Sequence, residues 1–107
     1  MSWPEPPAPE TYVLRLFVAG ATLRSQRAIS HLRHICNEHL PGRFDLEVVD
    51  VYTNPEATLE YQIVATPTLV KVRPEPPRKI IGDLSDHGRV MRGLNITAGG
   101  GISEAVQ

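Results

Sequence analysis

The sequence predicts a single α/β domain with the element order βαβαββα. Three stretches lead to this prediction. Residues 12–18 are dominated by β-branched and aromatic side chains, which is typical of a buried strand. Residues 25–40 carry an amphipathic helical stripe, and the apolar run at residues 63–72 is broken by Thr66-Pro67 before it resumes as a β-rich segment. With 107 residues, of which 41% are hydrophobic, the chain can build one modest core but not two.

The first half of the chain predicts a βαβ unit. The strand at residues 12–18 ends at Ala19-Gly20 and should be central, with both faces buried. The helix at residues 25–40 ends at Pro41-Gly42. Its stripe consists of Ala28, Ile29, Leu32, Ile35, Cys36 and Leu40. Alternating apolar and acidic residues at 44–48 then begin a second strand that reaches residue 51, so the two strands should form a parallel pair.

The second half adds a short helix, a hairpin and a last helix. Asn54 is a predicted N-cap and Pro55 suits the first turn of a helix that runs to about Gln62. Pro67 cannot donate to a ladder and should precede a strand at residues 68–73. A proline-rich turn at residues 74–77 joins it to a strand at residues 78–81, and Ser85 is the predicted cap of the last helix.

Composition bounds the partners and the location of the chain. A formal net charge of -1 gives no basic field for nucleic acid or an acidic membrane surface. No apolar stretch approaches the roughly 18 residues of a membrane span. The first residues lack the basic and apolar regions of a signal peptide, which predicts a cytoplasmic protein. Residues 1–10 are a predicted disordered Pro-rich arm, residues 11–96 the domain and residues 97–107 a flexible Gly-rich tail.

The Ala-Thr-Pro-Thr string at residues 65–68 resembles the cis-proline loop of thioredoxin-like domains, but the chemistry of redox thioredoxins is missing. Their nucleophilic cysteine follows the first strand, and residues 19–24 contain no thiol. Cys36 is the only cysteine and lies on the apolar stripe, so an inert thiol is expected. For His31, His34 and His39 a solvated helix face is favoured over a metal site. No catalytic residue, metal or cofactor is therefore expected.

Five segments together carry a family resemblance. They are residues 12–20, Ser25, residues 50–55, residues 65–69 and residues 80–85. From Tyr12 to Asn95 the chain resembles the KaiB family of circadian clock proteins. The resemblance implies a non-enzymatic regulator that binds a KaiC-type ATPase, modulates its phosphorylation and timing cycle, and competes with a sensor histidine kinase. It also implies a metamorphic protein, in which a resting homo-oligomer, tetramer or dimer, with a βαββααβ arrangement exchanges with a thioredoxin-like monomer.

The resemblance also assigns residues. The implied partner-binding residues are Tyr52, Asn54, Pro55, Tyr61, Gln62, Thr66 and Pro67. The implied fold-switch residues are Pro67, Pro74, Pro76, Pro77, Gly82, Asp83, Gly93 and Asn95. Gly93 is the candidate for a position that takes a positive φ in only one of the two states. Glu47 and Gln62 stand where cyanobacterial relatives tend to carry lysine, which argues against KaiA as a partner. The alternative function is a thioredoxin-like or glutathione-dependent redox protein.

Overall fold

The computed structural model describes residues 11–96 and has the predicted βαβαββα order. The elements are β1 (Tyr12–Val18), α1 (Leu23–His39), β2 (Phe44–Asp50), α2 (Pro55–Glu60), β3 (Thr68–Arg73), β4 (Arg78–Ile81) and α3 (His87–Leu94). The predicted arm at residues 1–10 and the predicted tail at residues 97–107 lie outside the described residues. None of the helices within residues 11–96 has the length and apolar character needed to cross a membrane.

The four strands form one mixed sheet in the order β2-β1-β3-β4. β1 pairs in parallel with β2 and antiparallel with β3, which confirms its predicted central place. β3 and β4 form the predicted antiparallel hairpin. Leu16 and Phe17 are neighbours in β1 and both are fully buried. Because neighbouring side chains of a strand point to opposite faces, the sheet is covered on both sides at this point.

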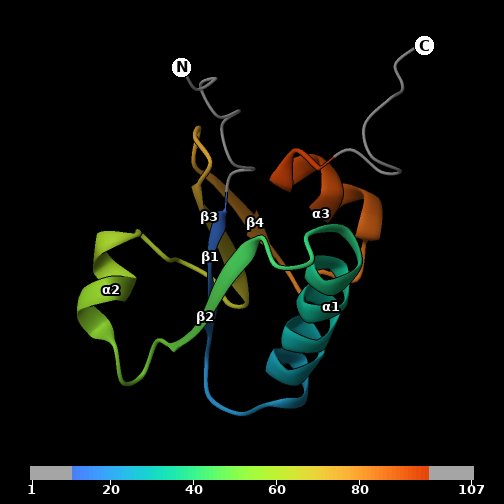
Figure 1. Cartoon of the computed structure of the whole chain (residues 1–107). Helices are drawn as coiled ribbons and strands as arrows, with labels where there is room; N and C mark the ends of the chain where they lie inside the picture. Colours follow the sequence, from blue (N-terminus) through green and yellow to red (C-terminus); the bar gives the residue numbers. More distant parts are fainter. Residues whose placement is uncertain (1–10, 97–107) are drawn as a thin grey trace, which may run out of the picture.

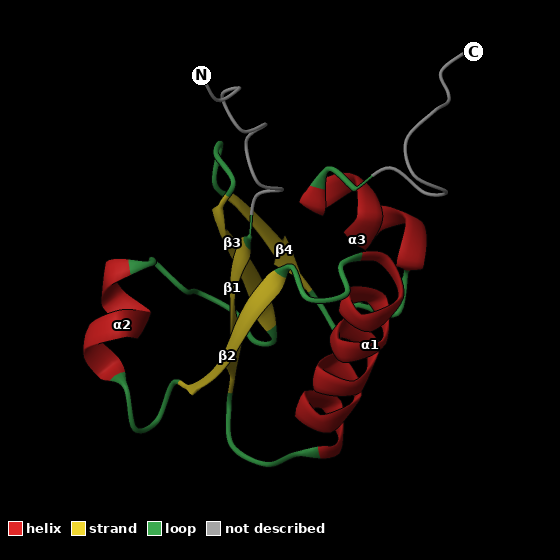
Figure 2. Cartoon of the chain, viewed as in Figure 1, coloured by secondary structure: helices red, strands yellow, loops and turns green. Residues whose placement is uncertain are grey.

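The two faces of the sheet are covered unequally. Figures 1 and 2 show α1 and α3 together on one side of the sheet and α2 alone on the other. The larger core lies between the sheet and α1 with α3, and includes Leu14, Leu32 and Leu94. The α2 side holds only a small cluster of Phe17, Val49 and Val70 with partly buried neighbours. Burial on the α1 side therefore supplies most of the hydrophobic stabilisation, and α2 rests on a smaller apolar base.

The helix starts correct three details of the sequence prediction. α1 begins two residues before the predicted Ser25, because Thr22 caps it and accepts a hydrogen bond from the Ser25 amide at 3.1 Å. The cap of α3 is Asp86 rather than Ser85, since Asp86 Oδ1 accepts from the Arg89 amide at 3.0 Å. Asn54 precedes α2 as predicted but makes no side-chain capping bond. In each case a cap needs a side-chain acceptor that reaches an amide two or three residues on, and composition alone does not select it.

The helix ends are also shorter than predicted. α1 ends at His39 and α2 ends at Glu60, two residues before the predicted Gln62. Gln62 has a φ of 56°, a left-handed value that cannot continue a right-handed helix. The chain leaves α2 at this point and turns back toward the sheet.

Candidate functional site

The predicted partner-binding residues lie in one continuous segment that leaves β2, forms α2 and returns to β3 (Figure 1). Three large apolar side chains on it are strongly exposed: Tyr52 at 75%, Leu59 at 80% and Val64 at 88%. We call the exposed part of residues 52–66 the α2 surface. Three strongly exposed large apolar side chains on one short segment, of which Tyr52 and Val64 line the same hollow, favour contact with another molecule.

Asp50, the last residue of β2, holds the start of this segment. Its Oδ1 accepts hydrogen bonds from the Tyr52 amide at 2.9 Å and from the Gly20 amide at 3.4 Å. The Asn54 amide Nδ2 donates to the Asp50 carbonyl at 3.0 Å. The chain is therefore turned sharply at the edge of the sheet, and the Tyr52 ring extends into solvent. Asn54 acts here as a turn residue, which is a common role for its short amide side chain.

Tyr61 and Gln62 lie where α2 meets the sheet. The Tyr61 ring is half-buried, with its centroid 5.6 Å from that of Phe17. The Gln62 carbonyl accepts a hydrogen bond from Lys79 Nζ at 3.1 Å, which ties the end of α2 to β4. Both residues line a groove of about 530 Å³ that continues along Val72 and Arg73. Tyr61 thus attaches the end of α2 to the sheet through its contact with Phe17. Gln62 remains exposed beside the groove.

Thr66 and Pro67 are adjacent in sequence but differ in how accessible they are to a partner. Thr66 lines a second hollow of about 240 Å³ together with Tyr52 and Val64. Pro67 is buried, follows a cis peptide bond, and accepts a hydrogen bond on its carbonyl from the Gly82 amide at 2.9 Å. Pro67 therefore belongs to the base of β3 rather than to the accessible α2 surface.

Leu59 and Val64 are the residues that the sequence analysis missed. Ala57 and Tyr61 are four residues apart and both pack on the small apolar cluster. Residues four apart share one face of a helix, so Leu59 between them must point away from the sheet. The spacing of Ala57 and Tyr61 could therefore have predicted that Leu59 is exposed. Val64 lies in a loop, where no periodicity indicates the direction of its side chain.

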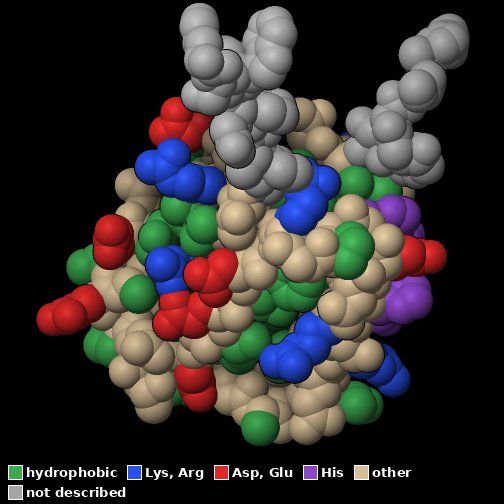
Figure 3. All heavy atoms as spheres, in the orientation of Figure 1, with side chains coloured by type: hydrophobic (Ala, Val, Ile, Leu, Met, Phe, Trp, Pro, Cys, Tyr) green, Lys and Arg blue, Asp and Glu red, His purple; other side chains and the backbone are tan. Residues whose placement is uncertain are grey.

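The α2 surface and the neighbouring β3–β4 hairpin differ in charge. Residues 52–67 carry Glu56 and Glu60 and no lysine or arginine. Figure 3 shows acidic side chains at the edge where α2 lies. Arg73, Arg78 and Lys79 line the groove beyond the end of α2. The α2 surface is thus apolar and acidic, with basic side chains on the neighbouring hairpin.

The predicted fold-switch residues surround β4 and the start and end of α3. Cis peptide bonds precede Pro74 and Pro76, and Gly82 has a φ of 124°. A hydrogen bond from the Ser85 side chain, helped by the Ser85 amide, lowers the pKa of Asp83 below its usual value. The hydrogen bond from a residue two positions later is typical of an aspartate in a turn, and it gives no evidence of a catalytic or a switching role for Asp83.

Gly93 does not use a positive φ in this structure, so the thioredoxin-like state is not the one in which the expected positive φ would occur. It lies inside α3, and a Cβ at this position would come within 2.4 Å of Ile80 Cδ1. The glycine is needed because α3 packs closely against β4 there. The left-handed residue is Asn95, the C-cap of α3, with a φ of 58°. A helix terminus commonly places glycine or asparagine in this conformation.

Cys36 is fully buried on the inner face of α1. Burial away from water raises the pKa of its thiol to about 11. A reactive cysteine needs an accessible thiolate near neutral pH, whereas the Cys36 thiol is buried and protonated at that pH. The geometry therefore gives no support to the redox alternative.

Comparison with known proteins identifies the family. The family model described as the KaiB domain matches residues 15–96. The chain belongs to the KaiB family. It is 53% identical over 87 residues to the circadian clock oscillator protein KaiB of Acaryochloris marina, covering 81% of this chain and 84% of that protein. It is 49% identical over 90 residues to KaiB1 of Synechocystis, covering 84% and 86%.

Solved structures place this KaiB-family chain in the thioredoxin-like fold. The N-terminal domain of Synechococcus elongatus SasA matches with a TM-score of 0.69 and 25% identity, over 96% of this chain and 99% of that one. Mitochondrial thioredoxin 3 of Saccharomyces cerevisiae matches with a TM-score of 0.65 and 20% identity, over 80% and 78%. The second likeness concerns the fold alone. Family and fold together support a clock regulator role, and the KaiB family is not known for enzymatic activity.

Proposed function

We propose that this chain is a non-enzymatic KaiB-type regulator that binds a KaiC-type ATPase through the α2 surface and modulates its phosphorylation and timing cycle. The observation that carries this proposal is the exposure of Tyr52, Leu59 and Val64 on one segment. Apolar side chains of this size stabilise a complex when they enter a pocket on a partner and lose their contact with water. Family membership indicates which kind of partner to test first.

The hydrogen bonds at the ends of the α2 surface support a preformed docking site. Asp50 fixes the chain before α2, and Lys79 holds the carbonyl of Gln62 after it. A segment that is already ordered loses less conformational freedom on binding, so more of the contact energy appears as affinity. A sensor kinase whose input domain has this fold could occupy the same site on the ATPase and so exclude this chain from it. We therefore propose competition with such a kinase.

The test is binding of the full chain to an ATP-loaded KaiC-type hexamer, followed by biolayer interferometry. Truncation of a central apolar anchor typically costs about 2 kcal/mol or more, which weakens binding by about 30-fold. We expect this loss for Leu59→Ala. Leu23→Ala is the matched control, because Leu23 is also an exposed leucine, at 63%, but begins α1. Equal binding of wild type and Leu59→Ala, or no binding at all, contradicts the proposal.

A homo-oligomeric resting state and a second fold are proposed on the family resemblance alone. Size-exclusion chromatography of the free chain, before and after addition of the hexamer, measures the first. A thiol-disulfide reductase assay on the same sample tests the redox alternative, for which buried Cys36 predicts no activity.

A further inference from the structure

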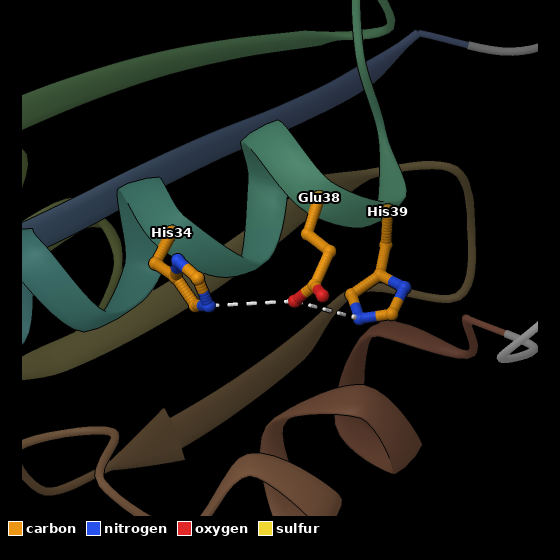
Figure 4. Close-up of polar contacts among 3 residues, drawn as sticks. All are labelled: His34, Glu38 and His39. Carbon is orange, nitrogen blue, oxygen red and sulfur yellow. Dashed lines mark ion pairs between the residues drawn. The ribbon is translucent and has the colours of Figure 1, made fainter.

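Three of the four histidines of the chain meet around one carboxylate on the side of the molecule opposite α2. His34 and Glu38 lie one turn apart on α1, His39 is its last residue, and His87 is the first residue of α3. Figure 4 shows Glu38 between the rings of His34 and His39. Figure 3 shows histidine side chains gathered at one edge of the molecule, with acidic atoms among them. We call these four residues the His–Glu cluster.

The atoms that could bind a metal are already close together. A carboxylate oxygen of Glu38 and one ring nitrogen each of His39 and His87 lie within 4.8 Å of one another. Nε2 of His34 is 3.4 Å from Glu38 Oε1, and Nε2 of His39 is 3.6 Å from the same oxygen. Around a tetrahedral Zn²⁺ with bonds of about 2.1 Å, ligand atoms are about 3.4 Å apart. Side-chain movements of about 1 Å would therefore bring the ligand atoms of Glu38, His39 and His87 to this spacing.

We propose that the His–Glu cluster binds a Zn²⁺ ion through Glu38, His39 and His87, with His34 as the fourth ligand. Three imidazole nitrogens and one carboxylate oxygen are a donor set that suits Zn²⁺. Mg²⁺ and Ca²⁺ require mostly oxygen ligands, and the cluster offers one carboxylate. His34 Nε2 lies 3.4 Å from the Glu38 carboxylate, so a rotation of the exposed His34 side chain would bring it to the same ion.

The arrangement exists only in the folded chain. His87 is distant in sequence from the α1 histidines, and it reaches them because α3 packs beside α1 (Figure 1). The sequence shows the α1 histidines alone, and these favour a solvated helix face. The C-terminal end of α1 favours a nearby cation, whereas the N-terminal end of α3 opposes one. These two effects oppose each other, so the four side-chain donors determine binding.

An ion at this place would join α1 to the start of α3. Because the donor atoms converge only when α3 is docked, the metal binds the folded state and stabilises it by mass action. His31, the fourth histidine, is not part of the set. Its Nδ1 lies 2.9 Å from the Asp83 carbonyl oxygen. It therefore provides a histidine control on the same helix.

The experiment titrates Zn²⁺ into the untagged full chain by isothermal calorimetry near pH 7.5, where free imidazole is mostly neutral. We expect one ion per chain, with binding weakened about tenfold or more by His87→Gln and by Glu38→Gln. His31→Gln should bind like wild type, and Mg²⁺ should give no signal. Thermal unfolding gives a second readout, since Zn²⁺ should raise the Tm of wild type and His31→Gln but not of His87→Gln.

The choice of variants keeps the proposal open to refutation. Glu38 and His87 are both exposed, so their substitution leaves the core untouched. Binding that is absent in wild type, or unchanged in His87→Gln, overturns the proposal. Binding that is lost equally in His31→Gln also overturns it, because His31 is not a ligand of the proposed site.

Discussion

Replacing Gly93 by alanine tests how α3 is held on the sheet. Gly93 lies within α3, and a Cβ built there would meet Ile80 Cδ1 at 2.4 Å and Ile80 Cγ1 at 2.8 Å. Real Cβ atoms do not approach other heavy atoms so closely. Ile80 is only 5% exposed and belongs to the larger core, so its side chain has little room to turn away. Either the isoleucine leaves its preferred rotamer or α3 moves off β4.

The magnitude follows from two opposing effects. Forcing an extra methyl group into a packed core typically costs about 1–3 kcal/mol. Alanine favours a helix interior over glycine by about 1 kcal/mol, which offsets part of this cost. The expected net loss in the free energy of unfolding is therefore about 1 kcal/mol. For a domain of this size such a loss lowers the Tm by about 4–8 °C.

The assay is urea and thermal unfolding followed by far-UV circular dichroism. Gly88→Ala is the matched control, because Gly88 is in the same helix and its Cβ would meet only the flexible end of Arg92, at 3.2 Å, and Asp86 at 3.7 Å. That variant should be neutral or stabilised, by up to about 1 kcal/mol. Ile80→Val removes the Cδ1 atom that the alanine would meet. The double variant Gly93→Ala with Ile80→Val should therefore lose less free energy of unfolding than the sum of the losses in the two single variants.

A Gly93→Ala protein as stable as Gly88→Ala would refute the close packing of α3 on β4. Additive effects of Gly93→Ala and Ile80→Val would refute it too, because residues in contact couple.

Three further predictions concern single side chains. Thr22→Ala should lower the free energy of unfolding by about 1 kcal/mol, measured by urea denaturation, because it removes the cap of α1. Cys36→Ala should cost of order 1 kcal/mol through lost buried volume and leave binding to the ATPase unchanged; loss of binding by the folded variant would revive a role for the thiol. The lowered pKa of Asp83 stabilises the folded state above the unfolded pKa of about 4, and this contribution is lost as the pH falls through the folded pKa. Asp83→Asn should therefore flatten the acid side of a plot of unfolding midpoint against pH, and an unchanged plot would contradict this.

The order of elements could be predicted because local patterns and the core agree along most of this chain. The stripe that includes Leu32, Ile35 and Cys36 is indeed the buried face of α1. The alternation in β2 was visible because its apolar residues are separated by acids. Thr22 and Asp86 were missed as caps because several polar residues near each helix start could fill that position. Only the geometry of the first turn selects among them.

The candidate sites were less predictable because they depend on contacts between distant segments. Leu59 is recognisable once Ala57 and Tyr61 are known to face the sheet, but the small cluster they join is made of three strands. The meeting of His87 with Glu38 requires α3 to be docked beside α1. Gly93 is the same kind of case, since its close neighbour Ile80 is on β4. A pattern along one element cannot reveal a neighbour on another.

The unequal cover of the sheet explains why the docking surface belongs on the α2 side. α1 and α3 bury the larger core, and any movement there would expose residues such as Leu14 and Leu94, which are fully buried. α2 is a helix of six residues without a buried residue, held mainly by Asp50, Lys79 and the Tyr61 ring. A partner that binds the α2 surface therefore leaves the larger core intact. Burial of Leu59 and Val64 in the complex would supply the apolar contact that the free domain lacks.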